Sequence, residues 1–211
     1  MIALDRAEGL WTVTLDRSEK ANALTEEMLT ELAGITEAAH GEARALILTG
    51  AGKVFSAGAD LGAARAGLAT SPVWERLSGA LAALPCLTVA ALNGTVAGGA
   101  MGMVLACDLR IAAQGAGAFY PVMRLGFRPQ PSDPARLAAL VGPARAKMIL
   151  LAGARITTDE ALAWGLFDRA VPHDGLMDAA QDLAADSLAA TPDHAAALKA
   201  MCRTGGAPAG K

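Results

Sequence analysis

The feature of this sequence that most limits its fold is a long uncharged run. No residue in Leu77–Cys107 carries a charge, so the run is long enough to cross a bilayer, and its glycines include the spacing of packed membrane helices. Pro85 and the pair Asn93-Gly94 nevertheless divide it, because Pro and Asn-Gly are strong turn signals. We therefore expect a buried strand at Leu87–Leu92 and no membrane span.

The end of this run predicts a site that holds an oxygen atom. Within Asn93–Asp108, Gly98-Gly99 followed by Ala100-Met101 is typical of a turn that opens into a helix. The first N–H groups of a helix have no intrahelical acceptor and attract partial negative charge.

A second glycine-containing loop follows another apolar run. Phe55–Leu61 comes after the expected strand Ala45–Leu48, and the ends of neighbouring strands in βαβ units lie side by side, where ligands bind. One N–H from each loop would form an oxyanion hole. The alternative is that the glycines only permit close packing.

Elsewhere, short strands alternate with helical segments, which predicts an α/β fold. Thr25 is expected to cap one helix, and Thr157-x-x-Glu160 is a capping box that Gly165 closes. Further strands are expected at Leu109–Ala112 and Phe167–Val171, and further helices at Ser71–Leu84, Ser132–Leu140, Pro143–Leu151, Leu176–Ala190 and Asp193–Cys202. The other expectations are a hairpin of Ile2–Leu4 with Leu10–Asp16, an irregular segment Ala118–Pro134 and a disordered tail Thr204–Lys211.

Composition excludes several classes of partner and site. A formal net charge of −3 and 4% aromatic residues give no reason to expect binding to nucleic acid or an anionic membrane. Without CxxC spacing, the cysteines are expected to be buried thiols in a reducing, cytoplasmic setting: Cys86, Cys107 and Cys202. The isolated histidines are expected at the surface, and no metal site is expected: His40, His173 and His194.

Three segments in the same order carry a family resemblance: Leu15–Leu24, Phe55–Leu61 and Asn93–Asp108. Together with Pro121–Pro129 and Thr157–Val171 they resemble the crotonase superfamily, the enoyl-CoA hydratase/isomerase family. The resemblance implies a spiral of ββα turns that binds acyl-CoA thioesters. It also implies that the N–H groups of Ala59 and Gly99 polarise the thioester carbonyl.

The resemblance further implies where coenzyme A, as part of the substrate and not as a separate cofactor, would bind. The implied residues are Lys20, Ala21, Ala57, Asp60 and Leu61. Residues 1–190 would form the core, and residues 191–211 a shortened C-terminal helix and tail. The expected assembly is a homo-oligomer, a trimer or hexamer. The short C-terminus weakens this expectation.

The sequence departs from the family pattern at both glutamates that related hydratases use. Those positions fall on Gly102 and Val122, and neither residue can transfer a proton. Asp133 is the candidate substitute acid or base, although an aspartate before a helix is more often a cap, here together with Ser132. Tyr120 and Arg124 are weaker candidates. Asp60 and Asp108 are expected to fix loops.

The sequence thus leaves three functions open. The first is an enzyme of this family, an acyl-CoA lyase, isomerase or hydrolase with a non-standard acid or base and weak hydratase chemistry. The second is a non-catalytic protein that binds acyl-CoA. The third is a structural subunit without a ligand.

Overall fold

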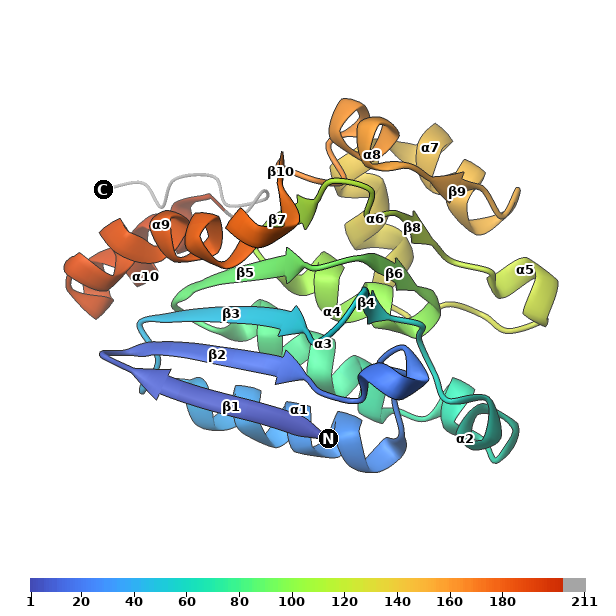
Figure 1. Cartoon of the computed structure of the whole chain (residues 1–211), viewed down its shortest axis with the longest axis horizontal. Helices are drawn as coiled ribbons and strands as arrows, with labels where there is room; N and C mark the ends of the chain where they lie inside the picture. Colours follow the sequence, from blue (N-terminus) through green and yellow to red (C-terminus); the bar gives the residue numbers. More distant parts are fainter. Residues whose placement is uncertain (203–211) are drawn as a thin grey trace, which may run out of the picture.

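The computed structural model describes residues 1–202, and two sheets organise it (Figure 1). The larger sheet has the strand order β1-β2-β3-β5-β7-β10 and the smaller one β4-β6-β8-β9. Pairing is parallel except for the β1/β2 hairpin and the β8/β9 pair. The larger sheet comprises β1 (Ile2–Ala7), β2 (Leu10–Leu15), β3 (Ala45–Gly50), β5 (Leu87–Leu92), β7 (Leu109–Ala113) and β10 (Arg169–Val171). The smaller one comprises β4 (Val54–Ser56), β6 (Thr95–Ala97), β8 (Ala118–Phe119) and β9 (Arg155–Ile156).

The chain visits the two sheets in turn and then forms a helix, which produces a spiral of ββα units. The units are β3-β4-α3, β5-β6-α4 and β7-β8-α6, and this is the crotonase-like architecture that the resemblance implied. The α-helices are α1 (Glu26–Ala39), α2 (Leu61–Arg65), α3 (Val73–Ala83), α4 (Met101–Ala106), α5 (Val122–Leu125), α6 (Asp133–Val141), α7 (Pro143–Leu150), α8 (Thr158–Trp164), α9 (Leu176–Ala189) and α10 (Pro192–Met201). The 3-10 helices are η1 (Ser18–Lys20), η2 (Leu68–Thr70), η3 (Gly98–Ala100) and η4 (His173–Gly175).

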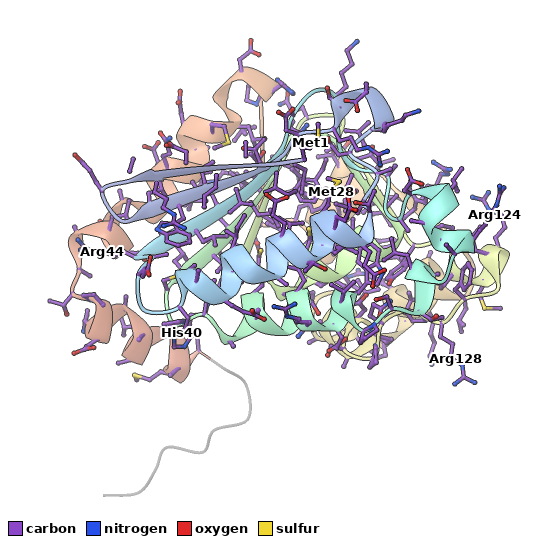
Figure 2. The ribbon with its side chains drawn as sticks, turned by 90° about the horizontal axis from the view of Figure 1, so that it is seen from below. Met1, Met28, His40, Arg44, Arg124 and Arg128 are labelled. Atoms are coloured by element: carbon purple, nitrogen blue, oxygen red, sulfur yellow. The ribbon has the colours of Figure 1, made fainter. Side chains whose placement is uncertain are left out.

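Helices cover both faces of the larger sheet. Figure 2 shows α1 and α3 lying side by side beneath it, with Met28 between α1 and the strands. On the opposite face α9 packs over β3, β5 and β7 through a smaller cluster that includes Ile47, Val89 and Leu176. Burial on both faces explains why β3 and β5 are almost wholly apolar.

The uncharged run divides where its turn signals predicted. It forms α3, β5, β6, η3 and α4, and β5 has the predicted bounds. None of the helices in residues 1–202 is long and apolar enough to cross a membrane.

Local capping predictions are also confirmed. The Thr25 side chain accepts from the Met28 N–H, the Thr157 capping box is complete, and Gly165 is left-handed at the end of α8. The three histidines are exposed as predicted.

Four predictions need correction or lie beyond the described residues. The expected loop after Ala45–Leu48 begins with strand β4, and the expected irregular segment contains β8 and α5. Cys86 and Cys107 are buried, but Cys202 is exposed. The prediction of a disordered tail concerns residues that the structure does not describe.

Charged side chains join the C-terminal helix α10 and the residue Ala190 before it to the rest of the chain. Lys199 Nζ lies 2.7 Å from an Asp108 carboxylate oxygen and donates to the Cys86 carbonyl at 2.7 Å. Arg44 donates to the Ala190 carbonyl at 2.6 Å, just before α10. A division of the chain at residue 190 stays a prediction.

Candidate active site

The two predicted loops meet at their backbones. Gly58 has φ +88°, and a Cβ placed there would lie 2.7 Å from the Ala97 carbonyl oxygen. Only glycine tolerates both the left-handed conformation and this approach. The loop after β4 therefore lies directly against the loop after β6.

Ala59 is held by its neighbours and leaves its own N–H free. Leu24 N–H donates to the Gly58 carbonyl at 2.8 Å, and Asp60 N–H donates to the Leu24 carbonyl at 2.8 Å. Within residues 1–202 no acceptor lies at the Ala59 N–H. The loop thus presents one oriented backbone donor.

Gly99 presents the second donor. It is the second residue of η3, so its N–H has no acceptor inside that 3-10 helix. A Cβ at Gly99 would lie 3.1 Å from the Trp74 ring, which explains why this position has no side chain. The prediction that Gly98-Gly99 opens into a helix is confirmed.

Both donors open on one apolar cavity of about 140 Å³. Residues of both α2 and α5, which are labelled in Figure 1, line the cavity. Its apolar walls come from Leu61, Trp74, Pro121, Val122, Leu125 and Phe127. A cavity of this kind suits an apolar group whose single polar atom is met by the two N–H groups.

Behind the cavity lies a buried hydroxyl–carboxyl pair. Tyr120 lines the cavity, and its hydroxyl donates to Asp133 Oδ2 at 2.8 Å. The Asp133 side chain is fully buried, and Oδ1 has no partner within residues 1–202. Burial raises the pKa of Asp133 to about 6, although the Tyr120 hydrogen bond partly opposes this. Burial, and then the neighbouring Asp133 charge, raise the pKa of Tyr120 far above its ordinary value.

The capping interpretation of Asp133 is wrong. Asp133 is the first residue of α6, and its carboxyl accepts from Tyr120 and from no backbone N–H. The Ser132 side chain does not cap the helix either, because it bonds Glu75 of α3. Arg124, the other candidate, is exposed on α5 and points away from the fold (Figure 2).

The two positions at which the resemblance places the family's glutamates, Gly102 and Val122, both lie at this site. Val122 is buried and lines the cavity. Gly102 is buried in α4, and a Cβ there would lie 2.9 Å from Asp133 Oδ1. The space beside Gly102 is therefore filled by a carboxyl from another helix.

The structure brings some of the predicted coenzyme A residues to the cavity and separates others from it. Ala57 and Leu61 line the cavity. The Ala21 carbonyl accepts the Ala57 N–H at 2.9 Å, so Ala21 lies beside this loop, next to the exposed Lys20. Binding of coenzyme A by these residues stays a prediction.

The two family aspartates fix loops, as expected. Asp60 caps α2 by accepting from the Gly62 and Ala63 N–H groups and pairs with Arg17 at 3.0 Å. The hydrogen bond from Arg17, with those from the backbone, lowers the pKa of Asp60. Asp108 accepts from the Thr88 N–H at 2.9 Å and the Thr88 hydroxyl at 3.0 Å, which joins the starts of β5 and β7.

Sequence reasoning gave no site role to several cavity residues, among them Trp74, Arg128 and Gln130. Trp74 lies on the apolar face of α3 and is buried, so its sequence position indicates only a core residue. Arg128 and Gln130 lie in an irregular segment whose path no local pattern predicts. No group of three or more His, Cys, Asp or Glu in the described part of the chain is placed to hold a metal ion.

Comparisons with known proteins agree on one family. The family profile described as enoyl-CoA hydratase/isomerase matches residues 5–209. A probable enoyl-CoA hydratase of Rhodobacter capsulatus is 40% identical over 176 residues, 81% of this chain and 68% of that protein. A carnitinyl-CoA dehydratase of Salmonella arizonae is 36% identical over 220 residues, 96% of this chain and 80% of that protein.

Solved structures agree as well. An enoyl-CoA hydratase/isomerase from Pseudoalteromonas atlantica has a TM-score of 0.88 at 28% identity, covering 96% of this chain and 82% of its own. A monofunctional enoyl-CoA isomerase from M. smegmatis has a TM-score of 0.80 at 29% identity, covering 94% and 90%.

Proposed function

Because the chain belongs to the enoyl-CoA hydratase/isomerase family, we propose that it binds acyl-CoA thioesters and stabilises their enolates. The observation that carries the proposal is the pair of free N–H groups, at Ala59 and Gly99, that open on one apolar cavity. The thioester carbonyl oxygen would lie between these two donors, and the acyl chain would lie against the apolar walls.

This arrangement favours the reaction intermediate over the substrate. When a proton leaves the carbon next to a thioester, negative charge moves to the carbonyl oxygen. Fixed N–H donors bind that charged oxygen more tightly than the neutral carbonyl, which lowers the barrier. Loss of one such donor costs about 3 kcal/mol in measured cases.

The proton chemistry of this site differs from two-glutamate hydration. Gly102 and Val122 cannot transfer a proton, whereas Asp133 is a buried carboxyl near the cavity. We therefore expect enolate chemistry with slow hydration of crotonyl-CoA. Coenzyme A enters as part of the substrate, and the expected assembly is a homo-oligomer, a trimer or hexamer.

A pair of matched ligands tests the oxyanion hole directly. Calorimetric titration would compare butyryl-CoA with S-butyl-CoA, a thioether that has the same chain length without the carbonyl oxygen. Two hydrogen bonds of about 0.5–1.5 kcal/mol each together contribute about 1–3 kcal/mol, or about 5- to 150-fold in affinity, so butyryl-CoA should bind that much more tightly. Equal affinity for the two ligands would exclude the oxyanion hole, and no binding of either would exclude acyl-CoA as the ligand.

A hydration assay with crotonyl-CoA, together with the exchange of acyl protons with solvent, separates the catalytic proposal from its alternative. The alternative function is a non-catalytic acyl-CoA-binding protein, and the absence of both glutamates favours it. That protein would bind butyryl-CoA and neither hydrate crotonyl-CoA nor exchange acyl protons with solvent. Rapid hydration would contradict the roles given to Gly102 and Val122.

A further inference from the structure

The hydroxyl–carboxyl pair behind the cavity is placed as a route for a proton. Tyr120 is only 3% exposed, yet it forms part of the cavity wall. Asp133 is 0% exposed and is absent from that wall, and within residues 1–202 its carboxyl accepts one hydrogen bond, the 2.8 Å bond from Tyr120. The Tyr120 hydroxyl is therefore the hydrogen-bonded link between a residue of the cavity wall and this carboxyl.

Gly102 is what allows the carboxyl to reach this place. A Cβ at position 102 would lie 2.9 Å from Asp133 Oδ1 and 3.2 Å from Oδ2, so even alanine would displace the carboxyl. Glycine inside a helix costs about 0.5–1 kcal/mol relative to alanine, and room for Asp133 accounts for its presence in α4. Gly102 follows Gly99 by about one helical turn, or roughly 5 Å along the axis, so the residue that makes room for the carboxyl and the residue that carries the second N–H donor belong to successive turns.

We propose that Tyr120 is the catalytic residue that exchanges a proton with the carbon next to the thioester, and that Asp133 is its buried positioning partner. In the forward step the C–H bond breaks and its proton moves to Tyr120 Oη. The proton of the Tyr120 hydroxyl moves to Asp133 Oδ2, and the electron pair passes to the carbonyl oxygen held by Ala59 and Gly99. The reverse step returns the proton to carbon. This inference rests on the function proposed above and names the residues that carry its proton transfer.

The charges around Asp133 suit a proton acceptor near neutral pH. Burial raises its pKa to about 6 and is the largest influence. Glu75, on α3, raises the pKa further, whereas Arg136, one turn along α6, lowers it. Helix α4 contributes no titratable group. Above about pH 6 the carboxylate can accept a proton, and below it the acceptor is already occupied.

Proton exchange in D₂O provides the test, because it requires only enolate formation. The probe is butyryl-CoA, whose short chain suits a cavity of about 140 Å³; an engineered cavity of about 150 Å³ holds benzene. Mass spectrometry would follow deuterium uptake at the carbon next to the thioester. Tyr120→Phe and Asp133→Asn should each lower the exchange rate by about 100-fold or more, with little change in the butyryl-CoA dissociation constant.

Matched variants distinguish proton transfer from a structural role. Ser132→Ala removes the neighbouring contact with Glu75 but leaves Tyr120 and Asp133 intact, so it should exchange at the normal rate. Gly102→Ala should slow exchange as much as Asp133→Asn. The rate of the unaltered protein should fall about tenfold per pH unit below about pH 6, and Asp133→Asn should lack this inflection.

The outcomes that would overturn this inference differ from those that would overturn the proposed function. Exchange at the normal rate in Tyr120→Phe, or the same pH inflection in Asp133→Asn, would overturn the inference. Binding of butyryl-CoA without any exchange would overturn it and leave the binding function standing. No binding would overturn both. If Tyr120→Phe fails to fold, the Asp133→Asn pH profile decides alone, with Ser132→Ala as its control.

Discussion

Burial of the Asp133 carboxyl suits the proposed proton transfer, but it lowers the stability of the folded protein as the pH rises. This carboxyl is fully buried, it accepts one hydrogen bond, and its pKa is raised from 3.8 to about 6. The folded protein therefore holds this proton more tightly than the unfolded chain does. It follows that the free energy of unfolding falls as the pH rises from about 4 through about 6, because the buried group must lose its proton.

Asp133→Asn should remove this pH dependence. A shift of about two pKa units corresponds to about 3 kcal/mol, so the variant should be more stable than the unaltered protein by up to about that amount above pH 7. Below about pH 4 both forms are uncharged at this position, and the two stabilities should converge. Urea unfolding at several pH values measures the difference, with Ser132→Ala as the control. Parallel pH dependences of Asp133→Asn and the unaltered protein would show that Asp133 is not held protonated by burial.

Asp133 also marks the limit of local sequence reasoning. An aspartate before a helix is usually a cap, and that rule uses only neighbours along the chain. The partner of this carboxyl is instead Tyr120, beyond α5, and the space for it is made by Gly102 of α4. The resemblance predicts that Gly102 replaces a carboxylate, and the packing shows that the Asp133 carboxyl occupies the space beside Gly102.

At the scale of elements, the sequence predicted a strand or helix well when the segment was long enough to show a pattern and was bounded by turn or capping residues. Strand β5 was predicted with its observed bounds because Pro85 and Asn93-Gly94 enclose a buried apolar run. The capping box of α8 was equally clear. Strands β4, β6, β8 and β9 are only two or three residues long, too short to show a period of two. Their pairing comes from long-range contacts.

Those short strands position the two loops of the site, and Gly58 is the point at which the loops touch. A left-handed alanine costs about 1–2 kcal/mol. Gly58→Ala should destabilise the fold by more than this, because the new Cβ would also lie 2.7 Å from the Ala97 carbonyl oxygen. The collision should push the loop that carries Ala59 away from Gly99. Binding of butyryl-CoA should then weaken about 2- to 10-fold, the value of one misplaced hydrogen bond.

Gly41→Ala is the matched control for that substitution. Gly41 has φ +84°, close to the +88° of Gly58, but nothing lies within 4 Å of the position of its Cβ. It should therefore show the backbone cost alone, with unchanged butyryl-CoA affinity. Thermal unfolding and calorimetric titration of both variants give the comparison. Equal losses in the two proteins would mean that the contact between the loops is not tight.

At the scale of the whole molecule, polar side chains with partners far away in the sequence help to join the parts of the spiral. Alternation of strands and helices predicts only an α/β fold, and the ββα spiral came from the family resemblance. Lys199 joins α10 to Asp108 and Cys86, and Arg110 joins β7 to the segment before β10. Such links depend on residues far apart in the sequence, which explains why no periodicity predicts them.

Arg110 is the most buried of these links and gives a test of how the molecule unfolds. Its side chain is 4% exposed, and it donates to the carbonyls of Leu166 at 3.0 Å, Cys107 at 2.8 Å and Asp108 at 3.3 Å, and to Asp168 at 3.0 Å. Arg110→Met would leave buried carbonyls unpaired, and each such group costs about 1–3 kcal/mol. We expect a loss of about 3 kcal/mol, which lowers Tm by about 6–12 °C for a chain of this size.

Arg76→Met supplies the comparison, because it also removes an arginine that pairs with a carboxylate. The Arg76–Glu37 pair is short, at 2.7 Å, but both side chains are nearly half exposed, and exposed pairs contribute little to stability. Its Tm should stay close to that of the unaltered protein. Circular dichroism and tryptophan fluorescence should give one coincident transition for Arg110→Met if β7 and the segment before β10 unfold together with the rest. Two separate transitions, or a fall in Tm no larger than that of Arg76→Met, would show that Arg110 does not join the two parts of the spiral into one cooperative unit.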